Sequence, residues 1–314
     1  MANPLGTSPV EPALVILAHN DPVHVRRLIA ACASQPIVLH VDSKTPDDVF
    51  TEMTHDLPQR VILAPRRDAR LASWSLVEAE LAGVRLALDR TDAEHILVMS
   101  GSDYPLTDPS RLAEVFAPFA GRSWIWNYPM PFPAWDVPGF RDGGLWRMRH
   151  RFATRADHIL WIASKPIFNP IRRSIHPDLE PRASMQWKVL SRSDAIRLLD
   201  CLESRPDLTK FGRSTFTPEE TFIPSVLASH RLWGEAALAP CAHSFSLANW
   251  PQGVVVQHPG WYTADDVAPL KARLTAAANV PESSLPNGGT PLFGRKFSSQ
   301  SGPELLDAVQ TLLW

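Results

Sequence analysis

Short apolar runs alternate with amphipathic segments through the first third of the chain. The runs lie at residues 13–18, 37–41, 61–63 and 96–99. Each is too short for a buried helix and has the unbroken apolar character of a strand covered on both faces. The segments between them have helical spacing, and the one at 73–88 is apolar enough to lie flat on a sheet. This alternation predicts an α/β fold with a mostly parallel central sheet flanked by helices and joined by right-handed crossovers.

The pattern becomes less regular after residue 119. Pro-rich residues 129–138 and Arg-rich residues 141–173 predict ordered loops and short helices. Further strands are predicted at 124–126, 184–190 and 254–256, and further helices at 193–202, from Thr217, at 265–278 and at 302–313. A length of 314 residues suits one large domain with two halves. We place these halves at 11–125 and 126–314.

Polar side chains follow the predicted strands directly. His19 comes after the first strand, Asp42 after the second and Asp103 after the fourth. The carboxyl ends of parallel strands share one edge, where open α/β sheets bind ligands. The alternative for Asp42 is a helix-capping turn, and for Asp103 a cap on the helix beginning near residues 108–110. No Gly-x-Gly-x-x-Gly or P-loop follows the first strand, which argues against a dinucleotide oxidoreductase or a P-loop kinase.

Composition narrows the class of protein further. A formal charge of −2 gives no general attraction to nucleic acid. Three unclustered cysteines have no metal-ligand spacing and fit a reducing compartment. No apolar run approaches the roughly 20 residues of a membrane span, so we expect a soluble protein that is not exported. Thirty prolines and 11 tryptophans predict long ordered loops with aromatic surfaces, as in carbohydrate sites, although aromatic cores have the same composition.

Five short stretches of the sequence together resemble the Core-2/I-branching β-1,6-N-acetylglucosaminyltransferase family, which includes the peptide O-xylosyltransferases. They occur in the family's order, at residues 40–44 (His-Val-Asp-Ser-Lys), 72–81, 100–106 (Ser-Gly-Ser-Asp-Tyr-Pro-Leu), 217–220 (Thr-Pro-Glu-Glu) and 294–297 (Gly-Arg-Lys-Phe). The resemblance implies a GT-A-type glycosyltransferase fold with a Rossmann-like sheet and a loop-rich acceptor lobe. It also implies a nucleotide-sugar donor bound by the first half, with acceptor binding and catalysis in the second. The family lacks the Asp-x-Asp metal motif, and this sequence has none either, so no metal or other cofactor is expected.

The resemblance assigns the general base to Glu220, the last residue of the Thr-Pro-Glu-Glu motif, with Glu219 as the second choice. Inverting glycosyl transfer needs a base on the acceptor hydroxyl and positive charge at the departing diphosphate. The same residues also form the pattern of a capping box, in which Thr217 and Glu220 only cap a helix. The pattern alone favours the cap, and the family match favours the base.

The resemblance assigns the leaving-group cation to Lys296, with Arg295 beside it. A fixed cation can neutralise the diphosphate in place of a metal. The alternative is a pair of exposed surface residues. The family's second basic residue, an upstream arginine, has only Gln257 and His258 at its position. Arg295 itself or a basic residue of the loop after the third strand could replace it; these loop residues are Arg66, Arg67 and Arg70.

Donor and acceptor contacts complete the predicted site. We expect Asp42 to hold the uracil or ribose of the donor, with His19, Lys44 and Asp103 nearby at the strand ends. Sugar rings stack on aromatic side chains, so the acceptor candidates are Trp146, Trp187 and Trp250. Any of these tryptophans could belong to the core instead.

The sequence therefore predicts a metal-independent inverting transferase that moves GlcNAc or xylose from a UDP-sugar to a hydroxyl of a glycan. Without a predicted membrane segment, it resembles a bacterial-type cytoplasmic enzyme of surface-polysaccharide synthesis, in solution or peripheral at the inner membrane. One alternative is a carbohydrate- or nucleotide-binding module without catalysis. Another is a nucleotidyltransferase, which would need metal-binding carboxylates that the sequence does not display.

Overall fold

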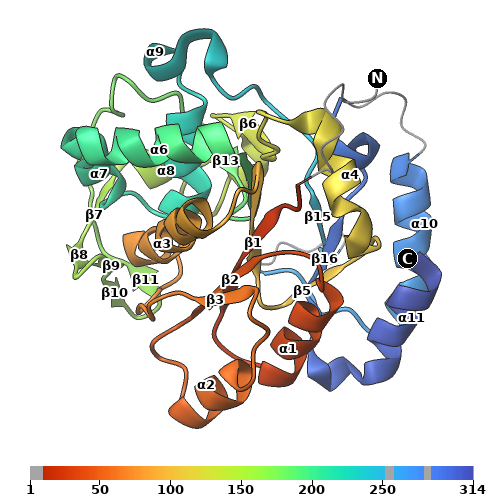
Figure 1. Ribbon diagram of the computed structural model, residues 1–314. Coiled ribbons are helices and arrows are strands. Elements are labelled where there is room, and N and C mark those ends of the chain that lie inside the picture. The colour runs from red at the N-terminus through yellow and green to blue at the C-terminus, as the bar shows by residue number, and fades with distance from the viewer. Residues whose placement is uncertain (1–9, 252–257, 279–283, 314) are drawn as a thin grey trace.

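A five-stranded sheet forms the centre of the protein, in a computed structural model that describes residues 10–251, 258–278 and 284–313. The strand order is β14-β4-β1-β2-β3 (Figure 1). The strands are β1 (Ala13–Ala18), β2 (Ile37–Val41), β3 (Val61–Leu63), β4 (His95–Ser100) and β14 (Lys188–Ser191). The first four are parallel, and β14 runs antiparallel to β4. The predicted α/β fold with a mostly parallel sheet is confirmed.

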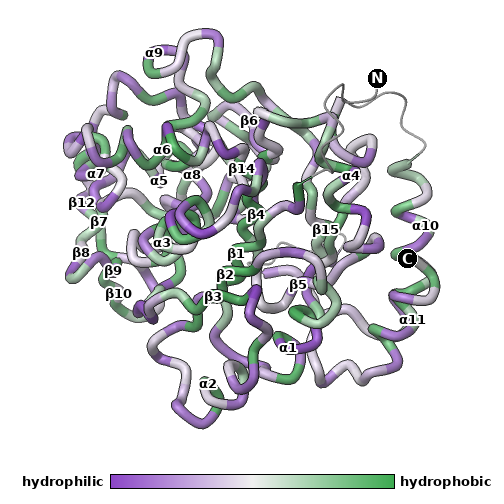
Figure 2. Tube along the Cα trace, viewed as in Figure 1, coloured by the Kyte–Doolittle hydropathy of each residue, from purple (hydrophilic) through white to green (hydrophobic). Residues whose placement is uncertain are grey.

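Both faces of this sheet are buried in hydrophobic cores. Leu14 and Ile16 of β1 face one core, and Val15 and Leu17 face the other, because successive strand residues point to opposite faces. Figure 2 shows these strands as a hydrophobic band through the middle of the molecule. A Cβ at Gly83 would come within 2.4 Å of the Val15 side chain, so this glycine lets a helix lie directly on β1.

Helices cover both faces of the sheet. The core on one face includes side chains from α1 (Pro22–Ala31), α4 (Leu112–Phe116), α10 (Val267–Ala278) and α11 (Pro303–Leu313). The core on the other face includes α3 (Trp74–Arg90), α6 (Arg192–Ser204), α7 (Pro206–Gly212) and α8 (Pro218–Leu227). The remaining helices are α2 (Asp47–Thr54), α5 (Trp146–Arg149) and α9 (His230–Trp233). The helices predicted from Ser73, Ser193, Thr217, Asp265 and Gly302 are thus present, with ends shifted by two residues or fewer.

A second, three-stranded sheet joins distant parts of the chain at the carboxyl edge of the first. Its order is β15 (Ser246–Ala248), β16 (Phe293–Arg295) and β5 (Asp103–Pro105). Strand β16 is antiparallel to β5, with Arg295 opposite Asp103. Two residues that are 192 positions apart in the sequence are therefore neighbours at the edge where the ligand site was predicted.

The irregular region after residue 126 is built from short two-stranded pieces. They are β6 (Asn127–Pro129) with β13 (Arg182–Ser184), β7 (Arg151–Phe152) with β12 (Phe168–Asn169), β8 (Thr154–Arg155) with β9 (His158–Ile159), and β10 (Trp161–Ile162) with β11 (Lys165–Pro166). Of these pieces, β7 to β11 lie at the left edge of the molecule in Figure 1. No helix in the described ranges has the length and apolarity that a membrane crossing requires.

Two strand predictions differ from the structure, and a third is not tested by it. Residues 184–190 are not one strand, because β13 ends at Ser184 in one sheet and β14 begins at Lys188 in another. Both pieces are buried, and only three partly buried residues, 185–187, lie between them. Residues 124–126 contribute a single bridge, Trp124 to Val189, and the strand begins at Asn127. The strand predicted at 254–256 lies outside the described residues.

Candidate functional site

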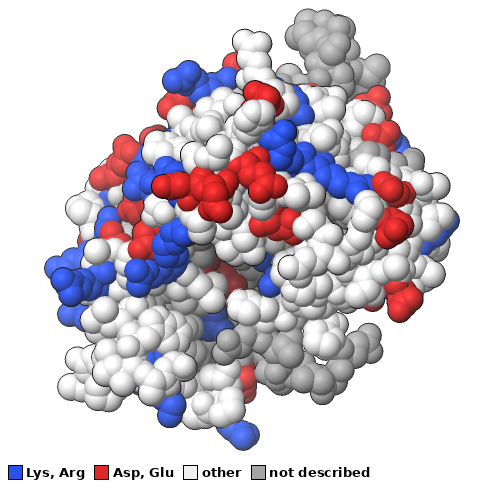
Figure 3. Space-filling model, turned by 90° about the horizontal axis from the view of Figure 1, so that it is seen from below, with Lys and Arg blue, Asp and Glu red and all other residues white. Residues whose placement is uncertain are grey.

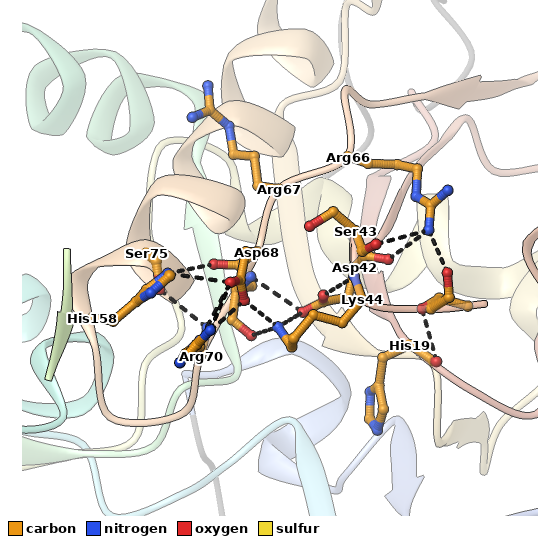
Figure 4. Close-up of polar contacts among 12 residues, drawn as sticks. His19, Asp42, Ser43, Lys44, Arg66, Arg67, Asp68, Arg70, Ser75 and His158 are labelled. Carbon is orange, nitrogen blue, oxygen red and sulfur yellow. Dashed lines mark hydrogen bonds and ion pairs between the residues drawn. The ribbon is translucent and has the colours of Figure 1, made fainter. Parts of the chain in front are cut away.

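Asp42 organises the loops at the carboxyl end of β2. Its side chain is 8% exposed and accepts hydrogen bonds from the backbone N–H of Lys44 at 2.8 Å and of Ala69 at 3.2 Å. The Lys44 ammonium bridges Asp42 at 2.8 Å and Asp68 at 2.5 Å. Figure 4 shows this row of contacts, which ends at Arg70. The turn expected as the alternative role of Asp42 is present, although it caps no helix, since the cap of α2 is Pro46.

His19 lies where the two sheets meet. It follows β1, its carbonyl oxygen accepts a hydrogen bond from the Thr45 hydroxyl at 2.9 Å, and its side chain is exposed. Partial burial of the ring lowers the pKa of His19, and Asp42 opposes this shift. The positive charges of Lys44, Arg295 and Lys296 lower the pKa further. Charges from both sheets therefore act on the same side chain.

Asp103 is a buried partner of Arg295. Its Oδ1 accepts a hydrogen bond from Arg295 Nη1 at 3.0 Å, and its Oδ2 accepts one from the Ser100 N–H at 2.9 Å. Burial raises the pKa of Asp103, while Arg295 opposes this shift. Asp103 is 0% exposed and its observed partner is Arg295, while its predicted contact with a donor stays a prediction. The capping alternative is wrong, because Asp108 accepts the hydrogen bond of Ser110 there.

Arg295 and Lys296 are each supported by a tryptophan. The Arg295 guanidinium carbon lies 4.4 Å from the ring centre of Trp187, and Lys296 Nζ lies 5.4 Å from that of Trp261. Partial burial lowers the pKa of Lys296, and so does Arg295. These side chains are held by specific contacts, unlike the freely solvated surface pair that was the alternative.

His258 is the third group near these two cations. Burial lowers the pKa of His258, and the charges of Lys296 and Arg295 lower it further. Gln257, the other residue at the position of the missing arginine, lies outside the described residues. The loop arginines have other contacts, since Arg66 donates to the carbonyl oxygens of 42, 43 and 45 and Arg70 pairs with Asp68. The Arg67 side chain points away from this network in Figure 4.

Glu220 lies in the first turn of α8 and pairs with Arg147. Glu220 Oε2 is 3.3 Å from Arg147 Nη1, which also donates to the Thr217 hydroxyl at 2.8 Å. The Arg147 guanidinium carbon lies 4.0 Å from the ring centre of Trp135. The Glu220 side chain keeps 33% of its surface exposed, so the carboxylate is both held and accessible. Burial of the carboxyl group raises the pKa of Glu220, and the charge of Arg147 opposes this shift.

The predicted capping box at Thr217 is wrong. Thr217 is the N-cap residue of α8, but its φ of 48° and ψ of 57° are left-handed, and its side chain makes no capping hydrogen bond. The hydroxyl instead donates to the Phe216 carbonyl oxygen and accepts from Arg147. Glu220 is therefore free of the reciprocal contact that the sequence pattern favoured, which removes the main objection to a chemical role.

Behind Glu220 lies a buried cluster of charged side chains. Lys188 Nζ and Glu80 Oε1 are 2.7 Å apart, and both side chains are 0% exposed. Glu219 is 1% exposed, and its Oε2 has no hydrogen-bond partner. Burial, with the nearby charge of Glu220, raises the pKa of Glu219 to about 8. A buried and neutral carboxylic acid cannot take a proton from an acceptor, so Glu219 does not fit the role of second-choice base.

Residues 187 and 188 connect the part of the site around Arg295 with the part around Glu220. Trp187 packs against Arg295, while the charge of Lys188 lowers the pKa values of both Glu219 and Glu220. Strand β14 begins at Lys188 opposite Val98, near the carboxyl end of β4. Figure 3 views the molecule from the carboxyl side of the parallel strands, and this face is hollowed near its centre.

The three candidate tryptophans differ in accessibility. Trp146 is 7% exposed and packs among Phe140, Phe152 and Phe216, and its predicted contact with an acceptor stays a prediction. Trp187 is partly buried beneath Arg295. Trp250 is 47% exposed and can stack on a sugar.

Sequence reasoning missed several residues of the site, namely Glu80, Trp135, Arg147, Lys188 and Trp261. Arg147 and Trp135 lie in the irregular region, where neither period nor motif separates one side chain from the next. Lys188 was predicted as part of a strand, and Glu80 lies in the family-like stretch 72–81 but received no role of its own. Among the described residues, no three His, Cys, Asp or Glu side chains are grouped as metal ligands.

A family model matches most of this chain. No curated protein sequence matches significantly. Among solved structures, the crystal structure of HddC from Yersinia pseudotuberculosis has 11% sequence identity over 59% of this chain and 78% of that chain, with a TM-score of 0.28. This likeness is too slight to carry an argument. The family model "Branch: Core-2/I-Branching enzyme" matches residues 24–272, which is most of the chain. With its mostly parallel α/β fold of GT-A type, the protein belongs to the Core-2/I-branching glycosyltransferase family.

Proposed function

We propose that the protein is an inverting, metal-independent glycosyltransferase that moves GlcNAc or xylose from a UDP-sugar to a hydroxyl of a glycan acceptor. The observation that carries this proposal is the contrast between two adjacent carboxyls. Glu220 is accessible and paired with Arg147, whereas Glu219 is buried and has an unpaired oxygen. Only Glu220 can meet an acceptor as a carboxylate.

In the proposed reaction, Glu220 accepts the proton of the acceptor hydroxyl as its oxygen attacks the anomeric carbon of the donor. The bond from that carbon to the diphosphate oxygen breaks, and UDP departs from the opposite face, which inverts the anomeric configuration. Arg295 and Lys296 neutralise the charge that develops on the diphosphate. These cations are supported by Trp187 and Trp261, so little reorganisation is needed as the charge forms.

For the donor, we propose that His19 and the loop organised by Asp42 and Lys44 form the nucleotide side of the site. The Asp42 carboxylate already accepts three hydrogen bonds from the loop. We therefore assign the direct contacts to loop backbone groups that Asp42 positions, and to the exposed His19. For the acceptor, we propose Trp250, with Trp187 at the side of the donor. The two halves of the domain, 11–125 and 126–314, then serve donor and acceptor.

The experiment that tests the proposal compares Glu220→Gln with wild type in UDP release and in UDP binding. The variant should lose transfer by 10²-fold or more, because the base is gone, while it binds UDP normally. Glu219→Gln is the matched control, since it replaces a neutral acid with an amide of the same shape and should keep most of the activity. Loss of activity in the control and not in Glu220→Gln would overturn the assignment.

A binding module without catalysis is the second candidate, favoured by the absence of an arginine at the position of His258. Assays in excess chelator separate the two, because a binding module releases no UDP from any donor. Stimulation by Mg²⁺ would instead favour a nucleotidyltransferase. We further propose a cytoplasmic enzyme that builds a bacterial surface polysaccharide.

A further inference from the structure

Positive charge is concentrated in one segment of the chain, of which the proposed reaction uses only Arg147. Residues 141–173 contain eight Arg and Lys side chains and two Asp side chains, a formal charge of +6 in a chain whose total is −2. The rest of the chain therefore carries −8. Arg147 is accounted for by its ion pair with Glu220. The proposed reaction gives no role to most of the other basic side chains in this segment.

Three short pieces of this segment form one small β unit, residues 151–169. Its centre is a ring of three hydrogen bonds, each 2.9 Å, in which Ala153 donates to Ile167, Ile167 to Leu160 and Leu160 to Ala153. Strand pairs β7–β12, β8–β9 and β10–β11 extend outward from this ring. The unit therefore has an inner and an outer face.

The inner face packs on the protein and supports the site. Phe152, Ile159 and Phe168 belong to one hydrophobic cluster with Trp146. Phe152 also lies 5.1 Å, centre to centre, from Phe216, which directly precedes Thr217 of the Thr-Pro-Glu-Glu motif. The β unit is thereby joined to the helix that carries Glu220.

The outer face combines apolar and basic side chains and has no acidic one. Its members come from the three strand pairs and from the residue between β9 and β10, and none belongs to the cluster of Phe152, Ile159 and Phe168. The apolar members are Leu160, 39% exposed, and Ile162, 68% exposed. The basic members are Arg151, Arg155 and Lys165, all exposed.

In the described ranges, the basic side chains of this face have no acidic partner. Asp157, in the turn between β8 and β9, is paired with Arg213. Among the described residues, no ion pair occupies any of the three basic side chains. Figure 3 shows Lys and Arg side chains gathered at the left edge, where these strands lie in Figure 1.

We propose that this outer face docks on an anionic lipid bilayer. An exposed apolar centre with basic side chains around it is the arrangement that binds at a membrane surface, with apolar groups entering the interface and cations near lipid phosphates. A soluble polyanion would need the cations but would gain nothing from Leu160 and Ile162. Docking through this face would hold the acceptor side of the site next to the membrane, where lipid-linked glycans are found.

Vesicle co-sedimentation tests the proposal with the full chain. Wild type should bind vesicles of phosphatidylcholine with 30% phosphatidylglycerol, weakly bind pure phosphatidylcholine, and release at high salt. Each basic side chain near such a surface contributes about fivefold, so Arg151→Gln/Arg155→Gln/Lys165→Gln should bind on the order of 100-fold more weakly. Ile162→Ser should also weaken binding, by several-fold.

Matched controls remove the same charge and the same apolar group elsewhere on the surface. They are Arg90→Gln/Arg111→Gln/Lys271→Gln and Ile196→Ser, all at exposed positions. Both should bind like wild type, and all variants should keep their melting temperature and their UDP release without vesicles. Three results would overturn the proposal: no binding to the anionic vesicles, equal losses in the control triple variant, or capture by heparin with no vesicle binding. Because binding is measured without catalysis, its failure is separate from failure of the proposed reaction.

Discussion

Arg147 Nη1 lies 3.3 Å from Glu220 Oε2, and this contact links the irregular acceptor region to the helix that carries the proposed base. Both side chains are largely shielded, at 15% and 33% exposure, so their interaction is less screened by water than a surface ion pair. Burial raises the pKa of Glu220, and Arg147 is the first group that opposes this shift. Arg147 thus favours the ionised form of the base.

Replacing Arg147 with Met should move the acidic limb of the kcat/KM profile to higher pH. The base must be deprotonated to work, and an adjacent arginine typically lowers a carboxyl pKa by 1–3 units. Without it, the pKa of Glu220 rises, so we expect the limb to shift upward by about 1–2 pH units. Arg147→Lys, which keeps the charge, should shift it less. Arg213→Met removes an arginine paired with Glu78 and Asp157 and should leave the limb in place. An unchanged limb in Arg147→Met would show that Arg147 does not act on the base.

Glu219 should make the protein less stable as the pH rises. Its pKa is raised by burial and by Glu220 from 4.5 to about 8. Between these values the unfolded chain releases the proton and the folded chain keeps it, so the free energy of unfolding falls with increasing pH. The slope from this group is at most about 1.4 kcal/mol per pH unit. Below pH 4.5 both states are protonated and the group contributes nothing.

Urea denaturation of wild type and Glu219→Gln, from pH 4.5 to pH 8, measures this effect. Glutamine does not titrate, so the two proteins should be similarly stable at pH 4.5, and the variant should gain on wild type as the pH rises. Asp92→Asn, at an exposed position, provides a control with the same chemical change. Parallel stability curves for wild type and Glu219→Gln would mean that Glu219 is ionised in the folded protein.

The extent to which the sequence predicted this molecule depends on how local each signal is. Strands β1, β2 and β4 and helix α3 were predictable, because apolar periodicity is set by residues that follow one another. The Thr-Pro-Glu-Glu pattern was misleading, because a left-handed φ at Thr217, with its backbone N–H donating to the Ala72 carbonyl oxygen, cannot be read from four letters. The contact of Asp103 with Arg295 depends on strand pairing across 192 positions. Short signals in the sequence located the ends of strands but not the partners of the side chains there.

Replacing one member of the buried pair Lys188–Glu80 should lower the free energy of unfolding strongly, whereas replacing both should lower it little. Their charged atoms are 2.7 Å apart with no exposure, and Glu80 Oε2 has no hydrogen-bond partner. Lys188→Met leaves Glu80 without its cation, which typically costs about 3–5 kcal/mol of stability. The double variant Glu80→Leu/Lys188→Met replaces both charges and should recover most of that loss. Urea denaturation at pH 7 provides the comparison, and additive losses in the double variant would contradict a coupled pair.

Replacement by alanine should lower the stability of the protein at Trp146 but not at Trp250. Trp146 is 7% exposed, and its ring centre lies 4.6 Å from that of Phe140 and 5.2 Å from that of Phe216. Its removal leaves a cavity in this cluster and should lower the free energy of unfolding by about 3–5 kcal/mol. Trp250 is 47% exposed, so Trp250→Ala should leave stability within about 0.5 kcal/mol.

The KM values for acceptor and donor test whether Trp250 stacks on the acceptor. If Trp250 stacks on the acceptor, Trp250→Ala should raise the KM for acceptor about tenfold and leave the KM for donor unchanged, because stacking on a sugar ring binds one substrate only. Trp250→Phe, which keeps an aromatic face, should recover part of the loss. Trp161→Ala is the matched control, since Trp161 has the same 47% exposure but lies on the β unit. A higher KM for the donor in Trp250→Ala would instead place this ring beside the nucleotide-sugar, because only a contact with the donor links its loss to donor affinity.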